Sequence, residues 1–224
     1  MDRDQLALAL EGAARAEHAF VTEAMIAYSP DAGAAMQAMY PTDADAARAA
    51  LAAAGWVDSN GDGTVDKGGS ELSVELLIDS GSAVETGAAP VLQAQLRAVG
   101  VDVRISMVDA TTLADTMDAG NFDFGLSGYS WADPDILTYR FTEGASPSQY
   151  APATLAEALD AARGIADPAD RTQAYLAIQT SIMEDAPVVP LLSEVLLVGA
   201  RSWVQGLKVV APDRLILNDV MIVE

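Results

Sequence analysis

Residues 101–141, VDVRISMVDATTLADTMDAGNFDFGLSGYSWADPDILTYRF, contain the pattern that decides the fold. Apolar and polar residues alternate through residues 101–107, which predicts a strand with one buried face. Helix caps at residues 109–112 precede an amphipathic helix that Gly120 ends. The apolar run at residues 122–127 then predicts a second strand, parallel to the first. The stretch is therefore a βαβ unit.

The turn after this unit carries the candidate ligand-binding residues Tyr129, Ser130, Trp131 and Asp133. Ligands of open parallel sheets bind beyond the carboxyl ends of the strands, where this turn is expected to lie. The indole of Trp131 offers a flat apolar platform, and the carboxylate of Asp133 offers a partner for an ammonium or guanidinium group. A purely structural alternative exists for both: Trp131 fills the edge of the core, and Asp133 caps the helix that Pro134 opens.

The rest of the chain continues the alternation of strands and helices, which predicts an α/β fold with a mainly parallel sheet. Residues 12–42 show no sustained period, so we expect either a helix within residues 16–27 or a segment that wraps another surface. A polar loop is expected at residues 145–152. The other predicted elements are helices at residues 2–10, 44–54, 84–99, 155–165 and 168–185, and strands at residues 72–78, 187–198, 206–210, 215–217 and 220–223.

Composition excludes several classes of function. The 224 residues carry a net charge of −21, which is incompatible with binding the phosphate backbone of nucleic acids. There is no cysteine, so disulfides, thiolate metal sites and cysteine nucleophiles are absent. His18 is the only histidine and no serine lies in a G-x-S-x-G context, so the sequence contains no recognisable catalytic constellation. We therefore expect no enzymatic activity and no cofactor.

The loop at residues 58–69, DSNGDGTVDKGG, partly resembles a calcium-binding loop. Asp58, Asn60, Asp62 and Asp66 fall at the first, third, fifth and ninth positions, where oxygen ligands are found. Gly69 stands at the twelfth position, where a bidentate glutamate would complete the coordination. Because a tight turn between a helix and a strand needs the same residue types, we favour a turn and keep calcium as the weaker alternative.

Four segments of the chain, taken together, resemble a known family. Their order and spacing are similar to those of the extracytoplasmic solute-binding proteins of ABC transporters that serve oligopeptides, dipeptides and nickel, family 5. Asp2 to Leu6 also resembles the place where the chain of that family enters its C-terminal lobe. The four segments are residues 50–69 (ALAAAGWVDSNGDGTVDKGG), 92–103 (LQAQLRAVGVDV), 120–135 and 179–190 (QTSIMEDAPVVP).

The resemblance implies a fold of the periplasmic-binding-protein-like II class and covers only the C-terminal part of a family member. It implies a leading helix and connection at residues 1–42, an α/β ligand-binding lobe with its following helices at 43–186, and strands at 187–224 that return toward an N-terminal lobe missing here. Helices and short strands near the C-terminus would then belong to that other lobe. In the family, the turn after the strand matched by residues 122–127 carries an aromatic and an acidic residue that face the ligand. The resemblance implies that Tyr129 or Trp131 is the aromatic residue here and Asp133 the acidic one.

The function implied is capture of a peptide or similar small solute in a cleft between two lobes, followed by delivery to the permease of an ABC transporter. The expected partners are the solute, the permease and the missing N-terminal lobe, and the expected location is periplasmic or extracytoplasmic, at the membrane through the transporter. The alternative is a complete small α/β enzyme or sensory domain.

Overall fold

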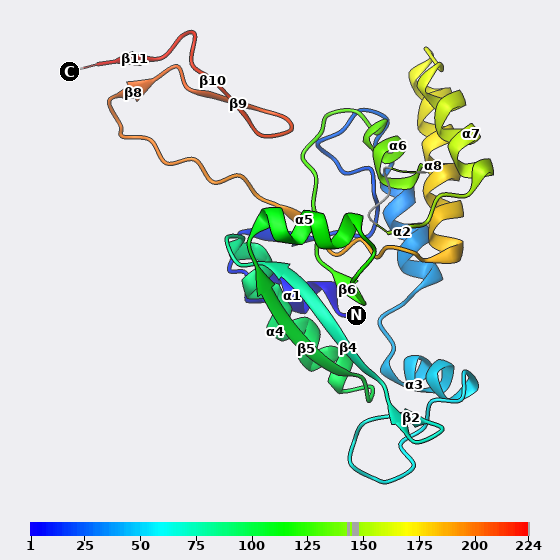
Figure 1. Ribbon diagram of the computed structural model, residues 1–224. Coiled ribbons are helices and arrows are strands. Elements are labelled where there is room, and N and C mark those ends of the chain that lie inside the picture. Colours follow the sequence, from blue (N-terminus) through cyan, green and yellow to red (C-terminus); the bar gives the residue numbers. More distant parts are fainter. Residues whose placement is uncertain (143, 145–147, 224) are drawn as a thin grey trace. The chain divides into compact units, whose positions relative to one another are not determined.

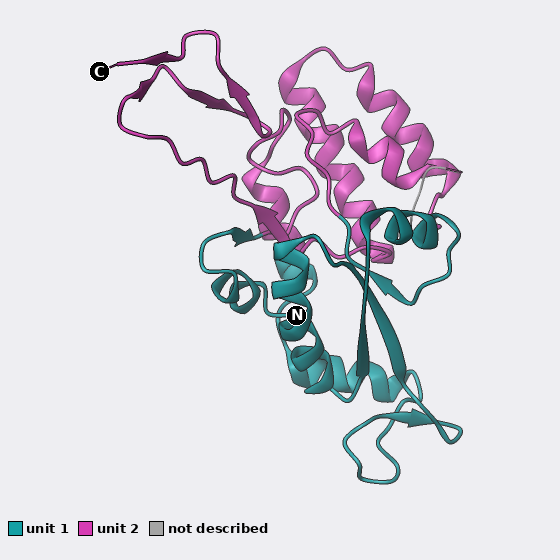
Figure 2. Cartoon of the chain, turned by 60° about the vertical axis from the view of Figure 1, so that its left-hand side comes forward, with its two compact units in different colours: residues 1–16, 37–127 teal, residues 17–36, 128–224 magenta. Residues whose placement is uncertain are grey.

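A computed structural model describes residues 1–142, 144 and 148–223 of the chain. The chain divides into two compact units, residues 1–16 with 37–127 and residues 17–36 with 128–224 (Figure 2). The predicted segments 1–42, 43–186 and 187–224 follow a different division, that of the lobes of a longer protein, and they stay a prediction. Helix α2, Pro30–Met39, spans the boundary between the units.

The first unit is built on a three-stranded parallel sheet in the order β5-β4-β6 (Figure 1). Strand β4 pairs with β5 from Ser73 beside Asp102 to Asp79 beside Val108. Because β4 lies between the strands of the predicted βαβ unit, the two are parallel but not adjacent. The elements of this unit are α1 Arg3–Ala9, β1 Ala14–Ala16, α3 Ala44–Ala53, β2 Asp66–Lys67, β3 Ser70–Glu71, β4 Ser73–Asp79, α4 Ala83–Arg97, β5 Asp102–Val108, α5 Ala110–Asp118 and β6 Phe124–Gly125.

Helices cover both faces of this sheet. Figure 1 shows α5 on one face and α4 on the other, and α1 packs against α4. On the α5 face, Leu77 of β4 forms a buried cluster with Leu113 and Met117. Leu113 and Met117 stand four residues apart, which puts them on one face of α5. The central strand is therefore buried on both sides, as expected of a parallel sheet.

Most helices begin where a capping residue predicts it. At the N-caps of α1, α3, α4, α5 and α8, a side-chain oxygen accepts a backbone N–H of the first turn, which satisfies one of the donors that a helix leaves unpaired there. Gly100 follows α4 at φ +92°, and a Cβ at this position would lie 2.7 Å from Val65 Cγ1, so only glycine fits. The capping residues are Asp2, Asp43, Ser82, Asp109 and Asp167.

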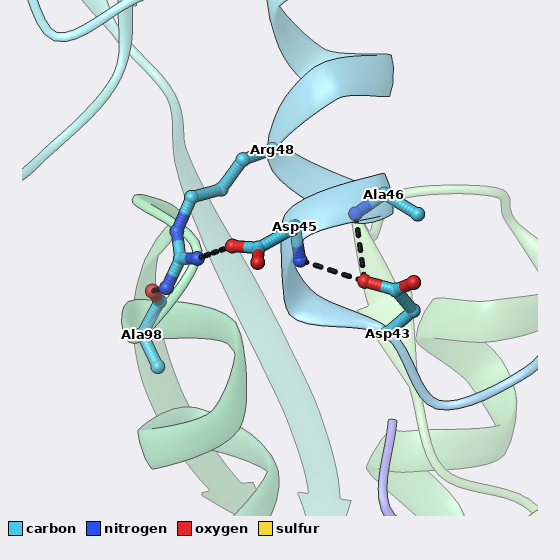
Figure 3. Close-up of polar contacts among 5 residues, drawn as sticks. All are labelled: Asp43, Asp45, Ala46, Arg48 and Ala98. Atoms are coloured by element: carbon cyan, nitrogen blue, oxygen red, sulfur yellow. Dashed lines mark hydrogen bonds and ion pairs between the residues drawn. The ribbon is translucent and has the colours of Figure 1, made fainter.

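Helix α3 is held by polar contacts because none of its residues is buried. Asp43 Oδ1 accepts the N–H groups of Asp45 and Ala46, both at 2.9 Å. Arg48 donates to Asp45 Oδ1 at 2.6 Å and to the carbonyl oxygen of Ala98 at 2.9 Å, which ties α3 to the end of α4 (Figure 3). The alanine-rich sequence thus forms a surface helix.

The second unit contains a helical layer and a set of short strands. Helix α7 packs against α6 and α8, and its Leu155 and Leu159 are buried with Ile178 and Ile182 of α8. Phe141 stacks edge to face on Phe20, with ring centroids 5.7 Å apart. The elements are α6 Ile136–Phe141, α7 Ala153–Arg163, α8 Pro168–Asp185, β7 Leu192–Glu194, β8 Val204–Gln205, β9 Lys208–Val210, β10 Arg214–Ile216 and β11 Met221–Ile222.

The C-terminal strands form two antiparallel pairs, β9 with β10 and β8 with β11. Gly206, at φ +78°, follows β8, and a Cβ there would lie 2.0 Å from the carbonyl oxygen of Asp219, so the second pair requires glycine at that position. The short strands predicted after residue 206 are confirmed.

Two sequence-based expectations fail in this unit. The predicted buried strand at residues 187–198 is wrong: only β7, Leu192–Glu194, is a strand, and Leu197 is 74% exposed. Its apolar side chains are exposed or half-buried, and none of them lies in the core. Of the two alternatives for residues 12–42, the helix within residues 16–27 is wrong, because the helix of this region is α2, Pro30–Met39. The alternative of a segment that wraps another surface stays a prediction. The polar loop expected at residues 145–152 lies partly outside the described residues.

Candidate functional site

The turn at residues 128–135, which carries the predicted ligand-binding residues, is the candidate site; it is called the Trp131 turn below. Asp133 Oδ1 accepts the backbone N–H of Asp135 at 2.9 Å, and the carbonyl oxygen of Asp133 accepts the N–H of Ile136 at 3.3 Å. Pro134 is buried. These contacts shape the chain for α6, and the predicted helix start after Asp133 is therefore found, although Asp133 is not itself the N-cap residue.

Tyr129 anchors the beginning of the Trp131 turn. Its hydroxyl donates to the carbonyl oxygen of Phe20 at 2.5 Å. The guanidinium of Arg140 lies over the ring, 5.4 Å from its centroid, and also donates to the carbonyl oxygen of Gly128. Burial raises the pKa of the Tyr129 hydroxyl above its ordinary value, so the group stays protonated and remains a donor.

Asp133 anchors the end of the Trp131 turn through Arg171 of α8. Arg171 Nη2 lies 2.7 Å from Asp133 Oδ1, and Nη1 lies 3.0 Å from Oδ2, which is the two-bond geometry of a strong arginine–carboxylate pair. The Arg171 guanidinium also lies 5.5 Å from the ring centroid of Tyr175. Asp133 is thus part of an ion pair that fixes the turn.

Trp131 and Ser130 lie on the surface between these two anchors. Trp131 is 48% exposed, and its Nε1 donates to Asp135 Oδ1 at 3.2 Å. Ser130 is exposed. The exposed indole is available as an apolar platform, while Tyr129 and Asp133 are engaged in contacts within the second unit. A ligand-binding role for Tyr129, Ser130, Trp131 and Asp133 stays a prediction.

Several residues of the site were missed by sequence reasoning. Arg171 and Arg140 contribute the cations of the Trp131 turn, yet Arg171 lies 38 residues from its partner Asp133. Gln179, which is buried, accepts the N–H groups of Phe20 and Val21 on its Oε1, both at 2.8 Å. The only available signal was the spacing of Arg171, Tyr175 and Gln179 at four-residue intervals, on one face of the predicted helix.

The loop between α3 and β4 shows the contacts of a tight turn. Asp58 accepts two backbone N–H groups of the loop, at 2.7 and 3.0 Å. Asp66 accepts the N–H and the hydroxyl of Ser59, at 2.9 and 2.7 Å, and these bonds lower the pKa of Asp66. Asn60 and Asp62 hydrogen-bond to each other at 2.7 Å. Across residues 1–142, 144 and 148–223, no group of three or more histidine, cysteine, aspartate or glutamate residues is placed to hold a metal ion.

Comparison with known proteins found a matching family model and curated relatives. Residues 1–149 match the family model described as bacterial extracellular solute-binding proteins, family 5, middle. The oligopeptide-binding protein AppA of Bacillus subtilis is 30% identical over 178 residues, which are 72% of this chain and 32% of AppA. Di/tripeptide-binding protein 4 of Pseudomonas aeruginosa is 26% identical over 153 residues, which are 63% of this chain and 29% of that protein. The chain thus spans about a third of the length of these curated relatives.

Solved structures share the fold. AppA from Bacillus subtilis, solved in complex with a nonapeptide, matches 87% of this chain and 40% of its own with a TM-score of 0.65 and 27% identity. HbpA2 from Haemophilus parasuis matches 100% of this chain and 43% of its own with a TM-score of 0.78, at 18% identity. In the described part of the chain, no helix has the length and apolar character needed to cross a membrane. The predicted α/β fold, with its parallel sheet, is confirmed.

Proposed function

Because the chain belongs to family 5 of the bacterial extracellular solute-binding proteins, we propose that the full-length protein containing it captures a peptide or a similar small solute and delivers it to the permease of an ABC transporter. The observation that carries this proposal is the family match over residues 1–149 together with 30% identity to an oligopeptide-binding protein. Members of this family are extracellular or periplasmic. The periplasmic side of the membrane, beside the permease, is the proposed place of action.

The proposed binding mode is closure of two lobes over the solute, with an N-terminal lobe outside this chain as the second wall. Closure follows from tighter binding of the solute to the closed state than to the open one. The Trp131 turn is the proposed contribution of this chain to the cleft, since its indole is exposed and its ends are fixed. Binding without catalysis is the proposed role.

Calorimetric titration of the full-length protein against a pool of di- to pentapeptides tests this function. We expect binding by the full-length protein and weak or absent binding by the 224-residue chain alone, because a solute needs convergent polar groups and apolar burial from two walls. Nanomolar binding by the chain alone would contradict the two-lobe mode. A folded full-length protein that binds none of these peptides would contradict the peptide class.

The natural reading frame tests the alternative of a complete small enzyme or sensory domain. Our proposal requires a coding sequence for a further lobe ahead of Asp2. A frame without one would favour the alternative.

A further inference from the structure

We infer that Arg171 is a positioning residue that sets the Trp131 turn through Asp133, and that Asp135, rather than Asp133, is the carboxylate beside Trp131 that a bound solute meets. This inference rests on the proposed function of the turn in solute binding. It assigns one cation and one carboxylate that the sequence did not single out.

The carboxylate of Asp133 is already occupied. Oδ1 bonds to Arg171 Nη2 and to the backbone N–H of Asp135, and Oδ2 bonds to Arg171 Nη1. The Arg171 side chain is 16% exposed and that of Asp133 is 33% exposed, so solvent screens this pair less than it screens a surface pair. An ammonium group of a solute would have to displace a guanidinium held by two hydrogen bonds, which is unfavourable.

Arg171 connects the buried core of α8 to the Trp131 turn. It stands one helical turn before Tyr175, whose side chain is fully buried, and its guanidinium lies over that ring. From Arg171 the contacts lead to Asp133, then to the N–H of Asp135, and from the Asp135 carboxylate to the indole N–H of Trp131. Removing the guanidinium frees Asp133 and loosens every later contact in this series.

Asp135 differs from Asp133 in its partners. Among the described residues, no arginine, lysine or histidine lies within ion-pair distance of Asp135, and its Oδ1 accepts only the indole N–H of Trp131. The uncompensated carboxylate therefore adjoins an exposed indole. This pair suits a solute that carries a hydrogen-bond donor, such as an ammonium group, next to an apolar surface.

The test of positioning uses the full-length protein labelled with 5-fluorotryptophan, in which Trp131→Phe identifies the fluorine resonance of Trp131. Arg171→Met should move this resonance toward its position in the unfolded protein. Arg171→Lys keeps the positive charge but cannot make both hydrogen bonds to the Asp133 carboxylate, and it should move the resonance less. Arg163→Met is the matched control, because among the described residues Arg163 pairs with exposed Asp160 alone, at 4.0 Å. This variant should leave the resonance in place. An unchanged Trp131 resonance in Arg171→Met would overturn the positioning role. If Arg171→Met does not fold, an unchanged resonance in Arg171→Lys would overturn it instead.

The test of the carboxylate measures binding of the di- to pentapeptide pool to the same proteins by calorimetry. Asp135→Asn keeps an oxygen for the indole N–H, so we expect the Trp131 resonance to stay within its original line width while peptide affinity falls about tenfold or more. Arg171→Met should weaken binding by a similar factor, and Arg163→Met by less than twofold. Unchanged affinity in Asp135→Asn would overturn the role of Asp135.

The two readouts separate this inference from the proposed function. If the unmodified protein binds none of the peptides, the proposal that its solute is a peptide is wrong. The role of Asp135 as a contact for a peptide is then wrong as well. The fluorine resonance still decides whether Arg171 positions the turn, since it is measured without solute.

Discussion

The helical layer and the C-terminal strands of the second unit contain similar apolar residues, but the helices bury these side chains and the strands expose them. In α7 and α8, Leu159 and Ile182 are fully buried. In residues 195–223, Leu197 is 74% exposed and Ile222 is 77% exposed. Two packed helices cover each other's apolar stripes, whereas a two-stranded pair leaves its faces open. The difference indicates that the helices supply their own core, whereas the C-terminal strands leave their apolar side chains exposed.

The largest effect is expected for Leu159→Ala, which deletes side-chain atoms from the fully buried interface between α7 and α8. The cavity should lower the free energy of unfolding by about 3–4 kcal/mol. Urea unfolding of the 224-residue chain measures the change, with Leu197→Ala as the exposed control. Equal losses in the two variants would break the comparison between the regions.

A smaller loss is expected for Gln179→Leu. The substitution keeps the volume of the side chain but leaves the N–H groups of Phe20 and Val21 without the acceptor that Gln179 Oε1 provides. We expect a loss of about 2–3 kcal/mol, which urea unfolding detects. Gln173→Leu on the exposed side of α8 is the control, and a comparable loss there would show that the effect comes from the substitution itself.

Tyr129→Phe should have a more modest effect on the anchor of the Trp131 turn. It removes the hydroxyl that donates to the carbonyl oxygen of Phe20 and keeps the ring under Arg140. Thermal unfolding should show a loss of about 1 kcal/mol. Tyr139→Phe, at an exposed position of α6, should cost less. A variant as stable as the unmodified protein would show that the ring alone anchors the turn.

The smallest effect is expected for Leu217→Ala in the 224-residue chain, where Leu217 is exposed. The change in the free energy of unfolding should stay within about 0.5 kcal/mol. In the full-length protein, where we propose that the other lobe covers these strands, the same substitution should cost about 2 kcal/mol or more. Equally small effects in both proteins would contradict the proposal that the other lobe covers these strands.

Local patterns predicted most of the regular structure. The caps Asp43, Asp109 and Asp167 mark helix starts, and alternation of apolar and polar residues marks β5, because both signals act between near neighbours in the chain. Helix α2 was missed, since it begins at Pro30 in a segment without a sustained period. The false strand at residues 187–198 shows that apolar composition does not say whether a partner surface is present.

The candidate site was predictable only in part. The sequence singled out the Trp131 turn, but it contains 33 acidic residues and no pattern that pairs Asp133 with Arg171 across 38 positions. The packing of α8 in the tertiary structure decides which of the two carboxylates forms an ion pair with Arg171. Position along the chain therefore suggested Asp133, while the partners observed favour Asp135.

The bonds that Gln179 makes to residues 20 and 21 also have a consequence during synthesis. Gln179 follows Phe20 by 159 residues, so a ribosome adding about 5–20 residues per second needs roughly 8–32 s between them. Throughout that interval the two N–H groups lack their final acceptor and bond to water instead. The second unit can therefore complete its packing only after translation of α8. The sheet of the first unit, in contrast, has all its strands once β6 has emerged.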